Sequence, residues 1–544
     1  MEFRNAMGHF DSVPRIDISR SRFNRPQNIK LTLDSGELVP FYVDEVLPND
    51  TFQVDESMVI RMTTPKYPVM DNCAVETFYF YVPNRILWEH WKRFMGEADD
   101  MAWMQTAEYT VPIIKATNIK EGSILDYMGL PTKLQNEIQI NALPVRAYAM
   151  IWQEWFRDQN VDNPAVNSIG DEDTTYTDTA TTINEKLQQA YTGGRPLPVN
   201  KWHDYFTSTL PAPQRGPEVT LPMTGNATID GNATIYSYYD RNRGTKTNEN
   251  TNSNGVYDHS KTNEGVYLSP DGNNRYYLGA DTSSLAVNMA KVNSATINQL
   301  RQAFQVQKYY EEMARGGSRY REILRSLYGA IISDKTVQIP EYLGGSRVPI
   351  NVSQVIQTSQ TTESSPQGNT GAMSVTAIRK GAFTKSFEEH GWIIGVMCIR
   401  HDHTYQQGIE RQWSRKNKLD YYYPVFANLG EQAVLKKEIY AQGTEKDEEA
   451  FGYQEAWAEY RYKPNRISGK FRSNAEGTLD VWHYGDNYTS EPSLSQEWMK
   501  EGKEEIARTL LIQDEPQFIA DILISNISTR AMPMYSVPGL IDHH

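Results

Sequence analysis

Strand-like sequence occurs near both ends of this 544-residue chain, with helical and loop-rich sequence between the two regions. Residues 31–83 contain three segments rich in β-branched and aromatic residues, "LTLDSGELVPFYVDEVLP", "TFQVDESMVIRM" and "CAVETFYFYVP". Residues 375–544 add "SVTAIRKGAFTKSF", "GWIIGVMCIR", "FGYQEAWAEYRY", "RISGKFRS", "LDVWHYG" and "FIADILISNISTRAMPMYSVP". Neither region has enough strands to close a sandwich by itself. We therefore predict a mainly β fold, an eight-stranded antiparallel jelly roll with large helical and loop insertions, with separate β domains at the two ends as the alternative.

The interval 84–374 is predicted to hold these insertions. Helical periodicity occurs at about 84–96, 143–159 and 296–332, and the last of these contains a break at Gly316 and Gly317. Residues 214–290 are rich in Asn, Gly and Tyr and poor in aliphatic residues, a composition that favours turns over long elements. We expect this stretch to project from the fold and to be ordered by contact with a partner or with copies of itself. The last region, 375–544, is predicted to carry the remaining strands and a C-terminal tail.

The first 30 residues are predicted to form a basic N-terminal arm. They carry Arg15, Arg20, Arg22 and Arg25 and show no apolar periodicity. An extended arm of this kind can contact phosphates without reading sequence. A solvated, disordered terminus is the alternative.

Charge and composition narrow the classes of function. The net charge of −14 and the pI of about 5.3 make the whole chain a poor binder of nucleic acid, although a local basic segment can escape this limit. The two cysteines are far apart, which excludes a disulfide framework and indicates a reducing cytoplasm. No apolar run approaches the ~20 residues of a membrane span, and the N-terminal residues do not have the pattern of a secretory signal. The 33 Tyr and 11 Trp residues suit either extensive partner contacts or sugar-binding clefts.

Signatures of catalysis are absent from the sequence. It has no G-x-S-x-G, phosphate loop, H-E-x-x-H, G-x-G-x-x-G or C-x-x-C motif. We therefore assign no catalytic residues and no cofactor, and we expect a non-enzymatic protein. The acidic, aromatic-rich composition keeps a carbohydrate-active β-sandwich enzyme or lectin as the rival interpretation.

The segment "GWIIGVMCIRHDHTYQQG", residues 391–408, raises the possibility of a metal site. His401 and His403 are two residues apart, so on a strand they point to the same face. A third ligand is needed, and His390 lies at the far end of the preceding strand, about 30 Å away. We therefore predict no metal ligands, and we interpret the segment as a buried strand that runs into a polar loop. Histidines of neighbouring subunits that meet at a symmetry axis are the alternative route to a metal.

Several segments together resemble the major capsid proteins of the Microviridae, of the gokushovirus type. They include "FYVPNRILWEHWKRFMGE", "TINQLRQAFQVQKYYEEMARGGSRYREIL", "TYQQGIERQWSRKNKLDYYYPVFANLGEQAV" and "FGYQEAWAEYRYKPNRISGKFRSN", and they follow the order found in the family over nearly the whole chain. The resemblance is weakest over about 224–285.

This resemblance implies a capsid subunit with a jelly-roll fold. It implies that sixty copies form a T=1 icosahedral virion around circular single-stranded DNA, assembled in the cytoplasm of a bacterial host. It further implies that the 214–290 insertion forms a protrusion at the three-fold axes, facing a host cell-surface receptor. The implied partners are a small basic DNA-packaging protein and a minor, or pilot, capsid protein.

Overall fold

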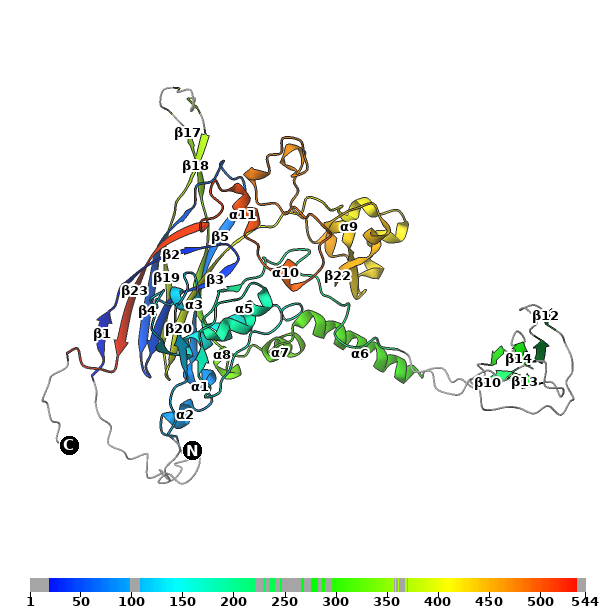
Figure 1. The fold of residues 1–544 in the computed structure, drawn as a ribbon, viewed down its shortest axis with the longest axis horizontal. Coiled ribbons are helices and arrows are strands. Elements are labelled where there is room, and N and C mark those ends of the chain that lie inside the picture. The colour runs from blue at the N-terminus through cyan, green and yellow to red at the C-terminus, as the bar shows by residue number, and fades with distance from the viewer. Residues whose placement is uncertain are drawn as a thin grey trace. The chain divides into compact units, whose positions relative to one another are not determined.

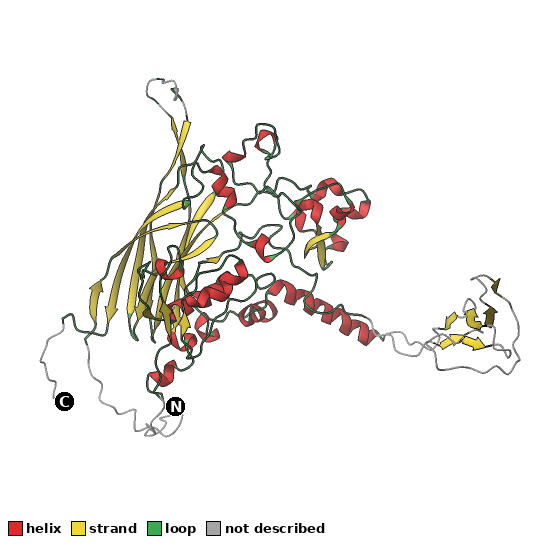
Figure 2. Ribbon diagram, in the orientation of Figure 1, coloured by secondary structure: helices red, strands yellow, loops and turns green. Residues whose placement is uncertain are grey.

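The structure is a computed structural model that describes residues 19–97, 108–220, 296–356, 358, 361, 367–368 and 370–535, and the backbone of six short strands between 228 and 288. The part of the chain outside 216–310 forms one compact unit. It is built on two antiparallel sheets of five strands each (Figures 1 and 2). The first contains β1 (Ser21–Asn24), β2 (Gln27–Leu33), β4 (Thr51–Met62), β19 (Thr376–Ser386) and β23 (Phe518–Arg530). The second contains β3 (Glu37–Val46), β5 (Cys73–Pro83), β9 (Leu197–Pro198), β16 (Glu341–Pro349) and β20 (Gly391–His401).

The two sheets bury a shared hydrophobic core between them. Phe52 and Ile522 of the first sheet belong to the same buried cluster as Tyr79 and Ile393 of the second. Strand β23 shows why one face of the first sheet is buried, because its residues alternate regularly between buried and exposed. The described residues therefore form a mainly β structure in which the sheets pack as a β-sandwich.

A helical layer covers the second face of the β20 sheet. Successive residues of β20 point to opposite faces, and Ile394 and Cys398 pack on this side against Trp88 and Trp152. Helix α4 (Leu143–Ile151) supplies most of the layer and continues into a π-helical turn, Trp152–Phe156. Because both of its faces are covered, β20 is apolar along nearly its whole length, and the predicted buried strand is confirmed.

The other helices and strands of this unit are short. The helices are α1 (Asn84–Leu87), α2 (Trp91–Phe94), α3 (Ile124–Tyr127), α5 (Ile183–Gln189), α7 (Tyr320–Tyr328), α8 (Asp334–Val337), α9 (Lys436–Ile439), α10 (Gln496–Met499) and α11 (Glu504–Thr509). The strands are β6 (Ile113–Ala116), β7 (Ile138–Asn141) and β8 (Thr174–Thr175) in one sheet, and the pairs β17 (Val352–Ile356) with β18 (Thr370–Ser374) and β21 (Glu431–Leu435) with β22 (Ala450–Glu455). Among the described residues, no helix combines the length and apolar character that a bilayer span requires.

Residues 216–310 form a second unit. Its described strands are β10 (Thr228–Asp230), β11 (Thr234–Tyr239), β12 (Thr245–Lys246), β13 (Val266–Leu268), β14 (Arg275–Asp281) and β15 (Ala286–Asn288). They form a four-stranded sheet in the order β12-β11-β14-β13 and a separate pair, β10 with β15. Helix α6 (Ile297–Gly316) begins in this unit and ends at the predicted glycine break, where Gly317 has a φ of 87°.

The structure differs from the sequence-based expectation in three respects. Strands β1 and β2 begin before residue 31, so the end of the predicted basic arm belongs to the first sheet. The expected strands "RISGKFRS" and "LDVWHYG" contain only single 3-10 turns, at Gly469–Phe471 and Asp480–Trp482. In "RISGKFRS", Gly469 has a left-handed φ of 66° that interrupts extended backbone.

The third difference is β16, which lies inside the predicted insertion interval 84–374 and pairs along β5. Its Gly344 and Gly345 hide the strand pattern from sequence analysis, yet both are required by packing. A Cβ on Gly345 would lie 2.0 Å from the carbonyl oxygen of Thr77, and one on Gly344 would lie 2.3 Å from that of Ala382.

Candidate functional site

Residues 407–430 form a long exposed apolar segment among the described residues of the first unit. No residue between 407 and 430 is buried, and the only regular structure is three 3-10 turns. The exposed large hydrophobic residues of the segment are Ile409, Trp413, Leu419, Tyr421, Tyr422, Tyr423, Val425 and Leu429. Trp413 is 73% exposed and Val425 is 82% exposed. Soluble monomers rarely expose apolar side chains in such a concentration, so this segment has the character of a protein-contact surface.

Helix α7 and the residues after it offer a second exposed apolar surface. None of the nine residues of α7 is buried, and Tyr320 and Tyr328 are 66% and 77% exposed. Ile331, just beyond the helix, is 90% exposed. An amphipathic helix normally buries its apolar stripe, so this surface also suits a contact with another chain.

The four predicted phosphate-contacting arginines have different environments. Arg15 lies outside the described residues. Arg20 is exposed and donates hydrogen bonds to the carbonyl oxygen of Asn49 (2.7 Å) and to Oγ1 of Thr51 (2.9 Å). Arg22 is exposed on β1. Arg20 and Arg22 are therefore both exposed, next to and on β1, the strand at one end of the first sheet.

Arg25 has a structural partner. Its guanidinium binds both carboxylate oxygens of Asp44, at 3.1 and 2.6 Å, and its Nε donates to Oγ of Ser528 at 2.9 Å. A bidentate pair of this kind neutralises the cation and fixes its orientation. Arg25, in the turn between β1 and β2, therefore links β3 with β23 through its side chain, whereas phosphate contact by the four arginines stays a prediction.

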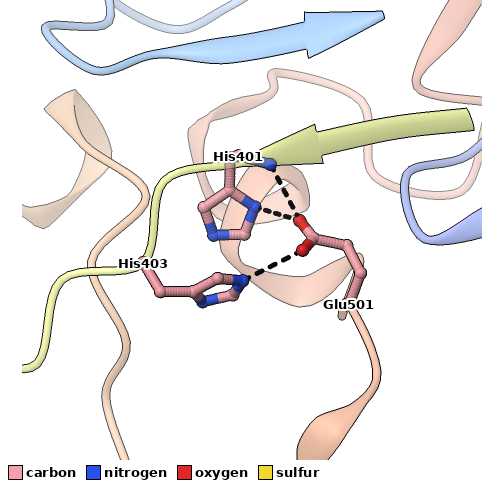
Figure 3. A group of neighbouring side chains, drawn as sticks. All are labelled: His401, His403 and Glu501. Atoms are coloured by element: carbon pink, nitrogen blue, oxygen red, sulfur yellow. Dashed lines mark hydrogen bonds and ion pairs between the residues drawn. The ribbon is translucent and has the colours of Figure 1, made fainter. Parts of the chain in front are cut away.

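The two histidines of "HDH" lie in a buried cluster and do not reach solvent. His401 is the last residue of β20 and is 0% exposed, and His403 is 9% exposed. The chain leaves β20 at His401 for an irregular polar stretch, as expected, but both histidines are buried there. The chain folds back so that Glu501 reaches the same place (Figure 3).

Glu501 binds both histidines. Its Oε1 lies 2.5 Å from Nδ1 of His401 and accepts a hydrogen bond from the backbone N–H of the same residue at 3.0 Å. Its Oε2 lies 3.0 Å from Nε2 of His403. The other ring nitrogen of His403 lies 2.9 Å from Oδ2 of Asp486, which is held by Lys201, whose ammonium is 3.5 Å from Oδ1.

The ionisable groups of this cluster stabilise one another in their charged forms. Burial opposes charge on His403, but the carboxylates of Asp486 and Glu501 outweigh it and raise the pKa of the ring above its usual value. Burial likewise opposes charge on the two acids, and the histidines lower the pKa of Glu501 while His403 and Lys201 lower that of Asp486. The cluster is therefore built to hold two carboxylates ionised in a site that excludes water.

Sequence analysis missed Glu501, Asp486 and Lys201. The separation along the chain is the reason, because Glu501 is 100 residues from His401 and is one of 68 acidic residues. The spacing of the two histidines was the only signal that the sequence contained, and it identified two of the three residues that meet. His390 is not part of the cluster and instead packs its ring against Trp91.

Comparison with known proteins identifies the family. The sequence matches the family described as "Capsid protein (F protein)" over residues 11–540. The chain belongs to this capsid protein family. It is 39% identical to capsid protein VP1 of Chlamydia phage 1, over 98% of this chain and 97% of that protein. It is 38% identical to capsid protein VP1 of Bdellovibrio phage phiMH2K, over 98% of both chains, and 35% identical to capsid protein VP1 of Spiroplasma virus 4, over 96% of both.

Membership of the capsid family confirms the predicted resemblance and the function of a major capsid protein of the gokushovirus type. A capsid protein is located in the virion and assembles with other capsid components into a shell. The relatives are structural proteins, which points to a non-enzymatic role. For a capsid protein, exposed apolar surface such as residues 407–430 is where contacts between chains are expected.

Proposed function

We propose that sixty copies of this chain assemble into a closed T=1 icosahedral shell around circular single-stranded DNA, without enzymatic activity. The exposed 407–430 segment carries this proposal, because its eight large hydrophobic residues need a partner surface to be removed from water. Closed point-group symmetry lets each copy bury the same surfaces in the same way. Assembly takes place in the cytoplasm of a bacterial host, with a small basic DNA-packaging protein and a pilot protein as further components.

The fold of the subunit in this proposal is an eight-stranded viral jelly roll. Four nested strand pairings support it. In chain order the first long strand, β2, pairs with the last, β23, and the others pair as β3 with β20, β4 with β19 and β5 with β16. Nested pairing of this kind arises when one long hairpin is rolled around a core, which is how a double Greek-key jelly roll is built.

We propose that Arg15, Arg20, Arg22 and Arg25 face the shell interior and contact phosphates. Replacing Arg15, Arg20 and Arg22 together with Gln is expected to lower the amount of packaged DNA, measured by absorbance of purified particles. In solution, the logarithm of the affinity for single-stranded DNA falls linearly with the logarithm of the salt concentration. Loss of three phosphate contacts should make the slope of this line less negative by about 2.

Arg25 needs a separate variant because it also holds Asp44. Arg25→Gln is expected to lower the stability of the subunit, so a packaging defect in that variant alone would not test DNA contact. Unchanged packaging and an unchanged salt slope in the triple variant would refute the proposed interior role.

The insertion 214–290 is proposed to form the protrusion at the three-fold axes and to attach the particle to its host receptor. Residues 216–310 form a compact unit of their own, so removal of 224–285 leaves the sandwich core intact. We expect this deletion to permit shell assembly but to reduce adsorption to host cells roughly tenfold or more. Normal adsorption of the shortened particles would place the receptor contact elsewhere.

The rival function, a carbohydrate-active enzyme or lectin, predicts different behaviour of the monomer. A lectin binds soluble glycans with saturation in the absence of assembly, and a hydrolase cleaves them with a pair of carboxylates. We expect neither from the monomeric chain on a glycan array and in hydrolysis assays. Saturable binding or cleavage by the monomer, together with the absence of shells, would replace the capsid proposal.

A further inference from the structure

We propose that His401, His403 and Glu501 form a structural zinc site. Each residue offers one ligand atom, and the three atoms lie within 4.8 Å of one another. The histidine rings lie side by side, with centroids 4.1 Å apart, and both are directed toward the carboxylate of Glu501 (Figure 3). The three side chains are at most 1% exposed. A metal-binding arrangement is therefore completed within one chain, without the symmetry axis that the sequence interpretation required.

His403 has the hydrogen bonding of a metal ligand. Its Nδ1 is bound to Asp486 at 2.9 Å, while its Nε2 faces Glu501. A carboxylate on the outer nitrogen fixes the tautomer in which the inner nitrogen is free to bind a metal, and it increases the basicity of that nitrogen. Lys201 forms an ion pair with the other oxygen of Asp486, so the residues that orient His403 are in place without a metal ion.

His401 provides a second, independent observation. Its ring is completely buried: Nδ1 forms a 2.5 Å ion pair with Oε1 of Glu501, and Nε2 has no hydrogen-bond partner. A buried ring nitrogen without a partner is costly in free energy. A cation bound between Nδ1 and the Glu501 carboxylate would take the place of the proton that this pair otherwise shares.

The donor set selects zinc over the common alkaline-earth cations. Two imidazoles and a carboxylate are typical zinc ligands, whereas calcium and magnesium prefer oxygen ligands alone. Ligand atoms about 2.0–2.2 Å from a tetrahedral zinc are about 3.3–3.6 Å apart. The present contacts of 2.5 and 3.0 Å therefore need to widen by roughly 1 Å or less to admit the ion.

Glu505 is the candidate for a fourth ligand after a side-chain movement, because its carboxylate is not among the ligand atoms that lie within 4.8 Å of one another. Its Oε2 is buried without a hydrogen-bond partner. A site closed by four protein ligands is structural, because a catalytic zinc keeps one position for water or substrate. The burial of the cluster agrees with this role.

A metal bound here would connect the C-terminal end of β20 to the loop between α10 and α11, which is about 100 residues away in the sequence. His401 ends β20, and Glu501 belongs to the loop between α10 and α11. Glu501 donates its backbone N–H to the carbonyl oxygen of Val199 at 3.0 Å and packs on Gly36, where a Cβ would lie 2.3 Å from the Glu501 carbonyl oxygen. The ion would therefore join two parts of the chain, the end of β20 and the loop of Glu501, beside the turn between β2 and β3.

The test is metal binding by the full-length protein. After dialysis against zinc chloride and then against metal-free buffer, elemental analysis is expected to find one zinc per subunit. Cobalt in place of zinc is expected to give the visible absorption of a tetrahedral complex. Glu501→Gln and His403→Gln should lower the bound zinc by a large factor, whereas His390→Gln, a control outside the cluster, should leave it unchanged.

Two results would overturn the proposal. If the unaltered protein retains no stoichiometric zinc and its thermal unfolding temperature does not rise with added zinc, the cluster is a metal-free imidazolium shared between two carboxylates. If Glu501→Gln and His403→Gln both retain the full zinc content, the ion binds elsewhere. The first measurement uses the unaltered chain, so its outcome does not depend on whether a variant folds.

Discussion

Replacing Trp413 with Ala is expected to leave the subunit folded and to prevent shell assembly. The side chain is 73% exposed and packs in no buried cluster, so the free energy of unfolding should change by less than about 0.5 kcal/mol. An interface tryptophan at a contact between chains contributes about 2 kcal/mol or more, roughly a thirtyfold change in the association constant. Because a symmetric shell repeats the contact in every subunit, assembly should fail. Sedimentation and circular dichroism of the purified variant measure the two effects separately.

Met70→Ala is the matched control for this variant. Met70 is 72% exposed and lies outside the 407–430 segment, so it tests whether loss of any exposed apolar side chain prevents assembly. We expect shells from Met70→Ala and none from Trp413→Ala. Normal shells from Trp413→Ala would show that this segment is not an essential contact between subunits.

Replacing Trp152 with Ala is expected, unlike Trp413→Ala, to destabilise the folded subunit itself, because it removes a central residue of the helical layer. The side chain is 0% exposed, packs against β20, and donates a hydrogen bond from Nε1 to the carbonyl oxygen of Pro198 at 2.8 Å. The Lys500 ammonium lies 5.1 Å from the centre of its ring. Loss of the ring leaves a cavity and an unpaired carbonyl group, so we expect a loss of about 3–5 kcal/mol from the free energy of unfolding.

Urea unfolding of the monomeric subunit measures this effect. Typical domains have free energies of unfolding of about 5–15 kcal/mol, so the variant should be largely unfolded at modest urea concentration. Trp152→Phe, which keeps an aromatic ring but not the hydrogen-bond donor, should lose less. A loss below about 1 kcal/mol for Trp152→Ala would contradict the packing described for the helical layer.

Much of the sandwich could be predicted from sequence because its strands have patterns that are typical of strands. Strand β23 alternates between buried and exposed residues, and β20 is continuously apolar because both of its faces are covered. Strand β16 could not be predicted, since Gly344 and Gly345 are selected by the close approach of other backbones, which leaves no local signal. The prediction of a strand at "LDVWHYG" was wrong for the reverse reason. Its residues favour strands, but none of the described strands pairs with this segment.

The site was predictable only in part. Their spacing of two residues predicted that His401 and His403 lie on one side of the chain, and their rings are adjacent although His403 lies beyond the end of β20. The burial of both rings depends on Glu501 and Asp486, which reach the cluster through the tertiary fold, and nothing near them in sequence indicates that role. Arg25 shows the same limit, because its pairing with Asp44 depends on how β3 lies beside the N-terminal strands.

Cryo-electron microscopy of particles purified from cells that produce this chain with its virion partners tests the central claim most directly. We predict closed icosahedral shells of sixty copies, with the 407–430 segment, including Trp413, buried against a neighbouring subunit. Shells in which this segment remains exposed to solvent, or particles whose shell does not contain the chain, would contradict the account.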